Sequence, residues 1–179
     1  QQRVAIARAI VTDADLVEAT DFDRAQELRD RARKLYLRGR GYCVRALELR
    51  RAGVEAQLLI APDRALTWAR RDDVPLLYWT AAAWGSAIAV GLDQPGLVAD
   101  TPAVRALVER ALELDADYER GALHAVMISL EALGEAMGGS EARAREHFPE
   151  EPKLWIICGG GRRNRTVMAM TAERVESAV

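Results

Sequence analysis

The chain has 179 residues, which is enough for one domain with a hydrophobic core. Its 25 basic and 27 acidic residues give a net charge of −2. This balance excludes the strong overall positive charge of typical nucleic-acid-binding domains, so we expect no nucleic-acid partner. Cys43 and Cys158 lack metal-site spacing and are either free thiols or one disulfide, and two histidines are too few for a His-rich centre. We therefore expect neither a metal nor a cofactor.

The residues predict helices along almost the whole chain. Ala, Leu, Glu and Arg are abundant, and apolar residues recur at helical spacing. Glycines at 39 and 41 are expected to end one helix, and Gly53 to cap the next. Thr101 followed by proline, and Ser140 after two glycines, are typical helix starts. The predicted helices span residues 1–10, 22–38, 42–51, 62–71, 74–90, 101–114, 118–137 and 141 onward.

The segment 77–89 is made almost wholly of apolar and small residues. Such a helix must be surrounded by other helices or must line an apolar cavity. Its large aromatics Tyr78, Trp79 and Trp84 are therefore candidate ligand-facing or pore-lining residues, and the alternative is that all three fill the core or form a subunit contact. His124 also lies within an apolar helix. It is either a hydrogen-bonded core histidine or a residue that contacts a ligand.

An internal repeat indicates how the helices pack. The sequence Arg-Ala-Leu-Glu-Leu at 45–49 recurs at 110–114, a separation of 65 residues. This is close to two tetratricopeptide repeats of about 34 residues each, and residues 103–117 resemble the second half of such a repeat. No alternating strand pattern occurs before Pro152. We therefore predict an all-α fold of degenerate tetratricopeptide-like helical hairpins, packed as a compact bundle or solenoid.

Motifs for bond-making chemistry are lacking. Residues 1–11 resemble the segment after the signature motif of ABC-transporter ATPases, but the chain has no phosphate-binding GxxxxGK[ST] loop. A fragment related to such an ATPase is a distant hypothesis that would require ATP binding. The apolar run after Pro152 and the glycine-rich basic segment that follows it also lack the lysine of a phosphate loop, so residues 162–165 are expected to form a solvated loop. The sequence thus predicts a protein that is not an enzyme.

Three blocks carry a family resemblance: residues 33–42, residues 72–85 with Tyr-Trp-Thr-x-x-x-Trp-Gly at 78–85, and residues 110–124. Through them, residues 21–148 resemble the tetratricopeptide-like T component of TRAP-type transporters, the TatT family. The resemblance implies a homotrimeric periplasmic lipoprotein that docks the periplasmic solute-binding protein of the transporter. It also implies an apolar pore or cleft that passes a hydrophobic small molecule.

We expect residues 1–179 to form a single helical-repeat domain whose ends, 1–20 and 149–179, depart from the family pattern. The chain contains no lipobox cysteine, so a lipid anchor is expected only in the full-length protein. The alternative function is a general tetratricopeptide-like scaffold that binds a peptide or protein in its concave face. A polar groove rich in Asn, Lys and Arg would favour that alternative, but the chain has one Asn and two Lys.

Overall fold

The computed structural model describes residues 1–135 and 138–147, and this part of the chain contains helices and no strand. The predicted all-α fold is confirmed. No helix in this part has both the length and the hydrophobicity needed to cross a membrane. In chain order the elements are α1 (Gln2–Val17), α2 (Phe22–Arg50), α3 (Val54–Ile60), α4 (Pro62–Ala65), η1 (Arg71–Asp73), α5 (Val74–Ala89), α6 (Pro95–Val98), α7 (Thr101–Leu114), η2 (Tyr118–Arg120), α8 (Ala122–Glu131) and α9 (Glu141–Glu146).

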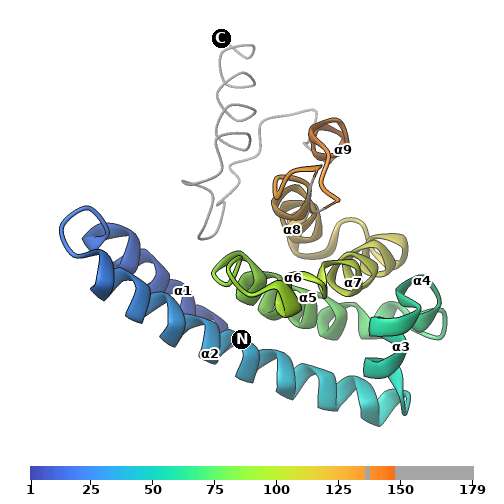
Figure 1. Ribbon diagram of the computed structural model, residues 1–179. Coiled ribbons are helices and arrows are strands. Elements are labelled where there is room, and N and C mark those ends of the chain that lie inside the picture. Colours follow the sequence, from blue (N-terminus) through green and yellow to red (C-terminus); the bar gives the residue numbers. More distant parts are fainter. Residues whose placement is uncertain (136–137, 148–179) are drawn as a thin grey trace.

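Helices α1 and α2 form a long antiparallel hairpin along one side of the molecule (Figure 1). Asp21 starts α2, because its Oδ1 accepts a hydrogen bond from the backbone N–H of Arg24 at 2.9 Å. Arg29 ties the two helices together through ion pairs with Asp15 and Glu18, each at 3.0 Å. The apolar face that α1 buries consists of Val4, Ala7, Ile10, Val11 and Ala14.

Helix α2 continues through both glycines, so the predicted break at Gly39 and Gly41 is wrong and the helices 22–38 and 42–51 are one. A glycine costs a helix interior about 1 kcal/mol relative to alanine, which tertiary packing can outweigh. A Cβ at Gly39 would lie 3.6 Å from the Cβ of Ala83 and 3.7 Å from Cγ2 of Val4. Three helices therefore approach closely at this glycine, and their packing keeps α2 continuous.

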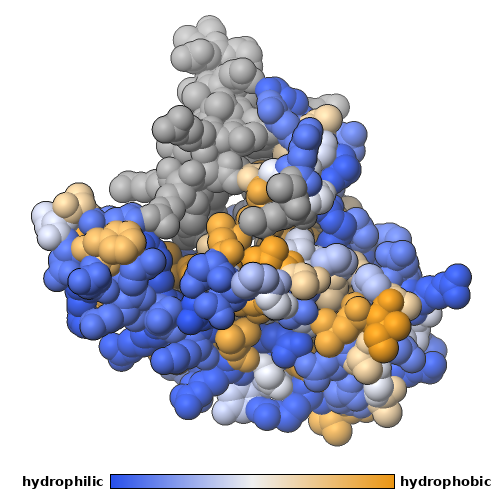
Figure 2. All heavy atoms as spheres, viewed as in Figure 1, coloured by the Kyte–Doolittle hydropathy of each residue, from blue (hydrophilic) through white to orange (hydrophobic). Residues whose placement is uncertain are grey.

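Helix α5 lies between the α1–α2 hairpin and α7 and is buried along most of its length. One side contributes Leu77, Trp84 and Ile88 to a core shared with α3, α7 and α8. The other side packs Ala83 and Ala87 against the hairpin. Hydrophobic spheres gather near the middle of the face in Figure 2, where Figure 1 places α5 and α6. The expectation that this helix is surrounded by other helices is confirmed.

The connection from α2 to α5 differs from the prediction. The sequence predicted a helix over 62–71, but α4 ends at Ala65, and the seven-residue helix α3 before it was not predicted. The indole Nε1–H of Trp68 donates to the carbonyl of Ala65 at 2.9 Å and stabilises the turn that follows. Asp73 immediately precedes α5, and its Oδ2 accepts the N–H of Arg70 at 2.9 Å. This carboxylate therefore closes the preceding 3₁₀ turn and does not cap α5.

The predicted helix over 118–137 is also divided. Glu119 and Arg120 have φ angles of 47° and 57°, and Gly121 has a φ of 90°, so the short η2 is separated from α8. Left-handed backbone cannot continue a right-handed helix. Helix α8 ends at Glu131. Helix α9 begins after Ser140 as predicted, and the Ser140 Oγ accepts the N–H of Arg143 at 3.4 Å.

Candidate functional site

Tyr78 and Trp79 lie side by side near the N-terminal end of α5 and are both half-buried. Their rings form an edge-to-face pair with centroids 5.1 Å apart. Tyr118 of η2 adds a third ring, 5.4 Å from Tyr78. Tyr118 belongs to the short η2, which the sequence pattern read as the start of a helix over 118–137, so the pattern did not place it in this group. These three residues, named here the aromatic cluster, combine apolar ring surface with polar tips.

Trp84 occupies a different environment, because its side chain is fully buried in the core. Its indole N–H donates to Oδ2 of Asp100 at 3.1 Å. The guanidinium of Arg40 stacks over the ring, 3.8 Å from the centroid, and also pairs with Glu55 at 2.8 Å. Every polar and cationic contact of the indole is thus made within the protein, and the ring joins α2, α5 and α7.

His124 of α8 contacts His147, which follows α9, with their Nδ1 atoms 3.1 Å apart. Such a contact requires one ring to donate an N–H and the other to accept it. Burial lowers the pKa of both imidazoles, and the pKa of His147 is lowered further by the charge of protonated His124. Carboxylates oppose these shifts only in part: Asp117 near His124, and Glu131 near His147. The pair therefore favours the neutral form of both rings.

Glu131 is the most enclosed carboxylate in the described part of the chain, with 2% of its surface exposed. It pairs with Arg105, accepts the N–H of Ser140 at 2.7 Å, and accepts two bonds from Arg143 at 2.9 and 3.0 Å. Burial alone raises its pKa, but the hydrogen bonds from Arg143 and Arg105 outweigh burial and lower it. Because its oxygens already accept these hydrogen bonds, the Glu131 carboxylate links α8 to α9 and is not free to accept a proton as a general base. We call this arrangement the Glu131 clamp.

A hollow of about 330 Å³ lies beside this clamp, between α7, α8 and α9. Within it, burial raises the pKa of Glu109, which the charge of Arg105 opposes. Charges of both signs line the hollow and largely compensate one another, so it carries no strong selectivity for an ion. Its lining residues are Arg105, Glu109, Leu112, Glu113, Met127, Glu131, Arg143 and His147.

The structure brings Tyr78 and Trp79 together, buries Trp84 fully in the core, and pairs His124 with His147. None of the four predicted site residues lines the hollow beside Glu131 or the second hollow, of about 340 Å³, between α1 and α2. Within residues 1–135 and 138–147, no three His, Cys, Asp or Glu residues gather as a metal site. Cys43 is a free thiol whose pKa burial raises, and Cys158 lies outside the described residues.

Sequence reasoning missed the residues around Glu131 altogether. Arg105, Glu131 and Arg143 come from three different helices, and their spacing carries no signal that they meet. A buried acidic residue within the apolar α8 segment was the one available indication, because a charge in such a place needs partners. The helical start at Ser140 was read correctly, but not the bond from its backbone N–H to Glu131.

Comparison with known families identifies the chain. The family model described as "TRAP transporter T-component" (TAtT) matches residues 4–167. This range extends beyond the resemblance over 21–148 at both ends. At its N-terminal end the match takes in nearly all of α1, consistent with the packing of α1 on α2.

Individual relatives match this chain either over a long region at low sequence identity or over a short region at higher identity. An uncharacterized protein of Treponema pallidum is 30% identical over 144 residues, which are 78% of this chain and 45% of that protein. The chain thus spans less than half the length of this relative. Anhydro-N-acetylmuramic acid kinases of Rhodospirillum rubrum and Bradyrhizobium diazoefficiens are 59% and 51% identical over 29 and 37 residues. These stretches are 8% and 10% of the kinases, too short for a catalytic domain.

Proposed function

The chain belongs to the TRAP transporter T-component family, and from this membership we propose that it docks the periplasmic solute-binding protein of its transporter. The family match over residues 4–167 is the observation that carries the proposal. The protein would act in the periplasm, held there by a lipid anchor in its full-length form. Separation of the periplasmic, membrane and cytoplasmic fractions of cells producing the full-length protein tests the location, and the anchored protein is expected in the membrane fraction. Recovery in the cytoplasmic fraction alone would contradict it.

The proposed assembly is a homotrimer. Several apolar side chains remain strongly exposed, which supports contacts with other protein surfaces. Leu49 at the end of α2 is 89% exposed, and Ile60 at the end of α3 is 84% exposed. We assign these two side chains to the contact between copies, where burial would remove them from water.

Light scattering tests this assembly directly. The expected mass is three times 19.7 kDa, and a double variant Leu49→Ser and Ile60→Ser is expected to elute as a monomer. Leu16→Ser removes another strongly exposed apolar side chain, on α1, and serves as the matched control. A trimer that the double variant leaves intact would contradict the assigned contact, and a monomeric parent protein would contradict the trimer.

The proposed ligand is a hydrophobic small molecule, contacted by Tyr78 and Trp79 of the aromatic cluster. Both rings are half-buried, so part of each ring surface contacts the protein and part remains accessible. An apolar ligand could contact the accessible part. Trp84 is fully buried in the core and His124 contacts His147, so the ligand contact is assigned to Tyr78 and Trp79 alone.

The neutral dye N-phenyl-1-naphthylamine is a suitable probe, because its fluorescence rises when it leaves water. Trp79→Ala is expected to weaken dye binding about tenfold, which corresponds to losing one aromatic contact. Trp68→Phe also removes one indole, but at a site outside the cluster, and is expected to change the affinity less than twofold. Equal effects of the two variants, or no dye binding at all, would contradict the assignment.

A further inference from the structure

The middle of α2 carries an excess of positive charge that the whole-chain balance conceals. Between Asp30 and Glu48 this helix has basic residues and no acidic one. Four of the arginines of α2 recur every seven residues, which places them along one stripe of the helix surface. The stripe consists of Arg24, Arg31, Arg38 and Arg45.

Some of the cations on α2 have partners, and some do not. Arg33 pairs with Asp30 at 3.0 Å, and Arg40 is engaged by Glu55 and by the Trp84 ring. In contrast, no carboxylate of the described part of the chain forms an ion pair with Arg38 or Arg45. The same is true of Arg3 on α1. Within residues 1–135 and 138–147, these three guanidinium groups therefore form no ion pair.

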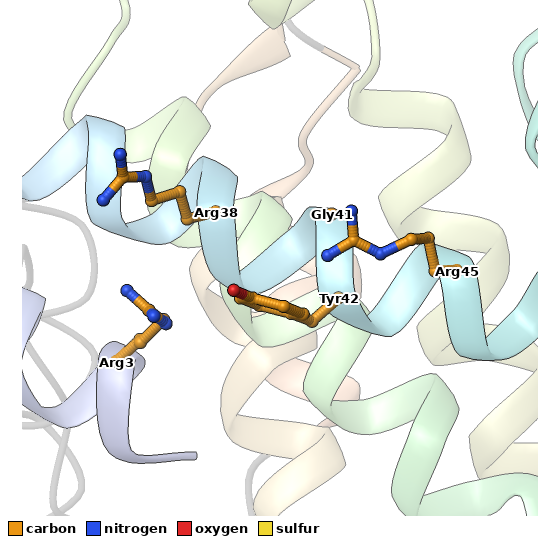
Figure 3. A pocket seen from close by; sticks show the side chains of 5 residues that line it. All are labelled: Arg3, Arg38, Gly41, Tyr42 and Arg45. Carbon is orange, nitrogen blue, oxygen red and sulfur yellow. The ribbon is translucent and has the colours of Figure 1, made fainter.

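These three arginines surround one hollow of about 340 Å³. Figure 3 shows Arg3 reaching from α1 toward Tyr42 and Arg45 extending from α2 toward the same ring, while the Arg38 side chain extends along α2 away from the ring. The guanidinium carbons of Arg45 and Arg3 lie 4.6 and 5.3 Å from the centroid of the Tyr42 ring. Gly41 completes the lining, and a side chain there would meet no neighbouring atom within 4 Å.

The arrangement is suited to an oxyanion. Arg3 and Arg45 both place a guanidinium over the Tyr42 ring, so their positive charges repel one another when no anion is bound, and a bound oxyanion would remove that repulsion. The planar fork of an arginine matches two oxygens of a phosphate or carboxylate. The Tyr42 ring, 54% exposed, holds two of the forks in place through cation–π contact. We propose that this hollow binds a phosphate or carboxylate group through Arg3, Arg38 and Arg45.

Inorganic phosphate is the first probe, titrated into the ¹⁵N-labelled protein with the ionic strength held constant by sodium chloride. We expect saturable shifts of the backbone amides of Gly41 and Tyr42. A double variant, Arg38→Gln and Arg45→Gln, is expected to weaken phosphate binding at least tenfold, because both forks are lost. Arg31→Gln removes an exposed arginine of the same stripe outside the hollow and is expected to change the affinity less than twofold.

These outcomes distinguish specific binding of the anion in the hollow from non-specific attraction between the anion and a positively charged surface. Absence of saturable shifts at Gly41 and Tyr42 would overturn the proposal, as would equal weakening by Arg31→Gln and by the double variant. Replacing Arg38 and Arg45 by lysine retains the charge but removes the forks, so about a fivefold loss is expected. The fold of each variant is checked by thermal unfolding, and the exposed positions of these side chains predict little change.

A second arm distinguishes the sources of the oxyanion. Sedimentation with phosphatidylglycerol vesicles, compared with phosphatidylcholine vesicles, tests whether a lipid headgroup supplies the phosphate. Sedimentation that the double variant abolishes would identify a headgroup. Phosphate binding without sedimentation would identify a free small anion. Neither arm uses the transporter partner or the trimer, so this site can fail while the proposed transport function stands, and the reverse also holds.

Discussion

Replacing Glu131 by glutamine tests the clamp between α8 and α9. The glutamine side chain keeps the shape of the glutamate but has one oxygen in place of two, and its NH₂ group faces groups that also donate. It cannot accept from Arg105, Arg143 and the Ser140 N–H together. At least one of these donors loses its partner.

The expected cost follows from the environment of that carboxylate. Breaking a buried ion pair costs about 3–5 kcal/mol, and the loss of a hydrogen bond to a charged group about 1.5–3 kcal/mol. The side chain of Arg143 is 49% exposed and can return to water, which reduces the loss. We therefore expect about 2–3 kcal/mol, which corresponds to about a 30- to 150-fold change in an opening equilibrium.

Hydrogen exchange measured by mass spectrometry is the appropriate assay, because α9 can open while the rest of the protein stays folded. Amides of residues 140–146 are expected to exchange about 30- to 150-fold faster in Glu131→Gln, with α1 and α2 unchanged. Glu27→Gln removes one partner of an exposed ion pair with Arg24 and should leave residues 140–146 unaffected. Unchanged protection of these residues in Glu131→Gln would refute the reasoning.

Three further outcomes follow from packing and protonation. Gly39→Ala is expected to stabilise the protein by up to about 1 kcal/mol in urea unfolding, because a Cβ there meets only ordinary van der Waals contacts. A decrease in stability would show instead that the three helices lie too close at this position for a methyl group. Trp84→Phe loses the indole N–H bond and is expected to destabilise by about 1–2 kcal/mol in the same assay. The lowered pKa values of His124 and His147 mean that the unfolded chain binds more protons. Stability is therefore fully present above about pH 6.5 and falls as the pH drops through the lowered folded pKa values, and His147→Gln should flatten that fall in thermal unfolding followed against pH.

The helical fold could be predicted because most of its signals are local. Apolar periodicity, Pro102 in the first turn of α7 and Ser140 before α9 each act within a few residues of the helix start that they mark. The errors came from non-local effects. Gly39 has a weak preference against helix, and contacts with α1 and α5 overrode it. Glu119 and Arg120 adopt left-handed backbone that neither residue type signals, so the division before α8 was not visible.

The candidate site could be predicted only in part. Tyr78 and Trp79 are adjacent in sequence and in space, so the aromatic segment located them, while Tyr118 required knowledge of the fold. The hollow lined by Arg3, Arg38 and Arg45 could not be predicted from the sequence, for a different reason. A net charge of −2 averages over the whole chain, and it conceals Arg38 and Arg45, whose seven-residue spacing becomes meaningful only on one continuous helix α2.

The most direct test of the central claim is the mass in solution of this protein mixed with the solute-binding protein of the same transporter. Light scattering on the separated mixture measures it. We expect a single species that contains both proteins and is heavier than a trimer of 19.7 kDa chains. Two species that elute separately, each with the mass it has alone at concentrations of tens of micromolar, would contradict the proposed docking.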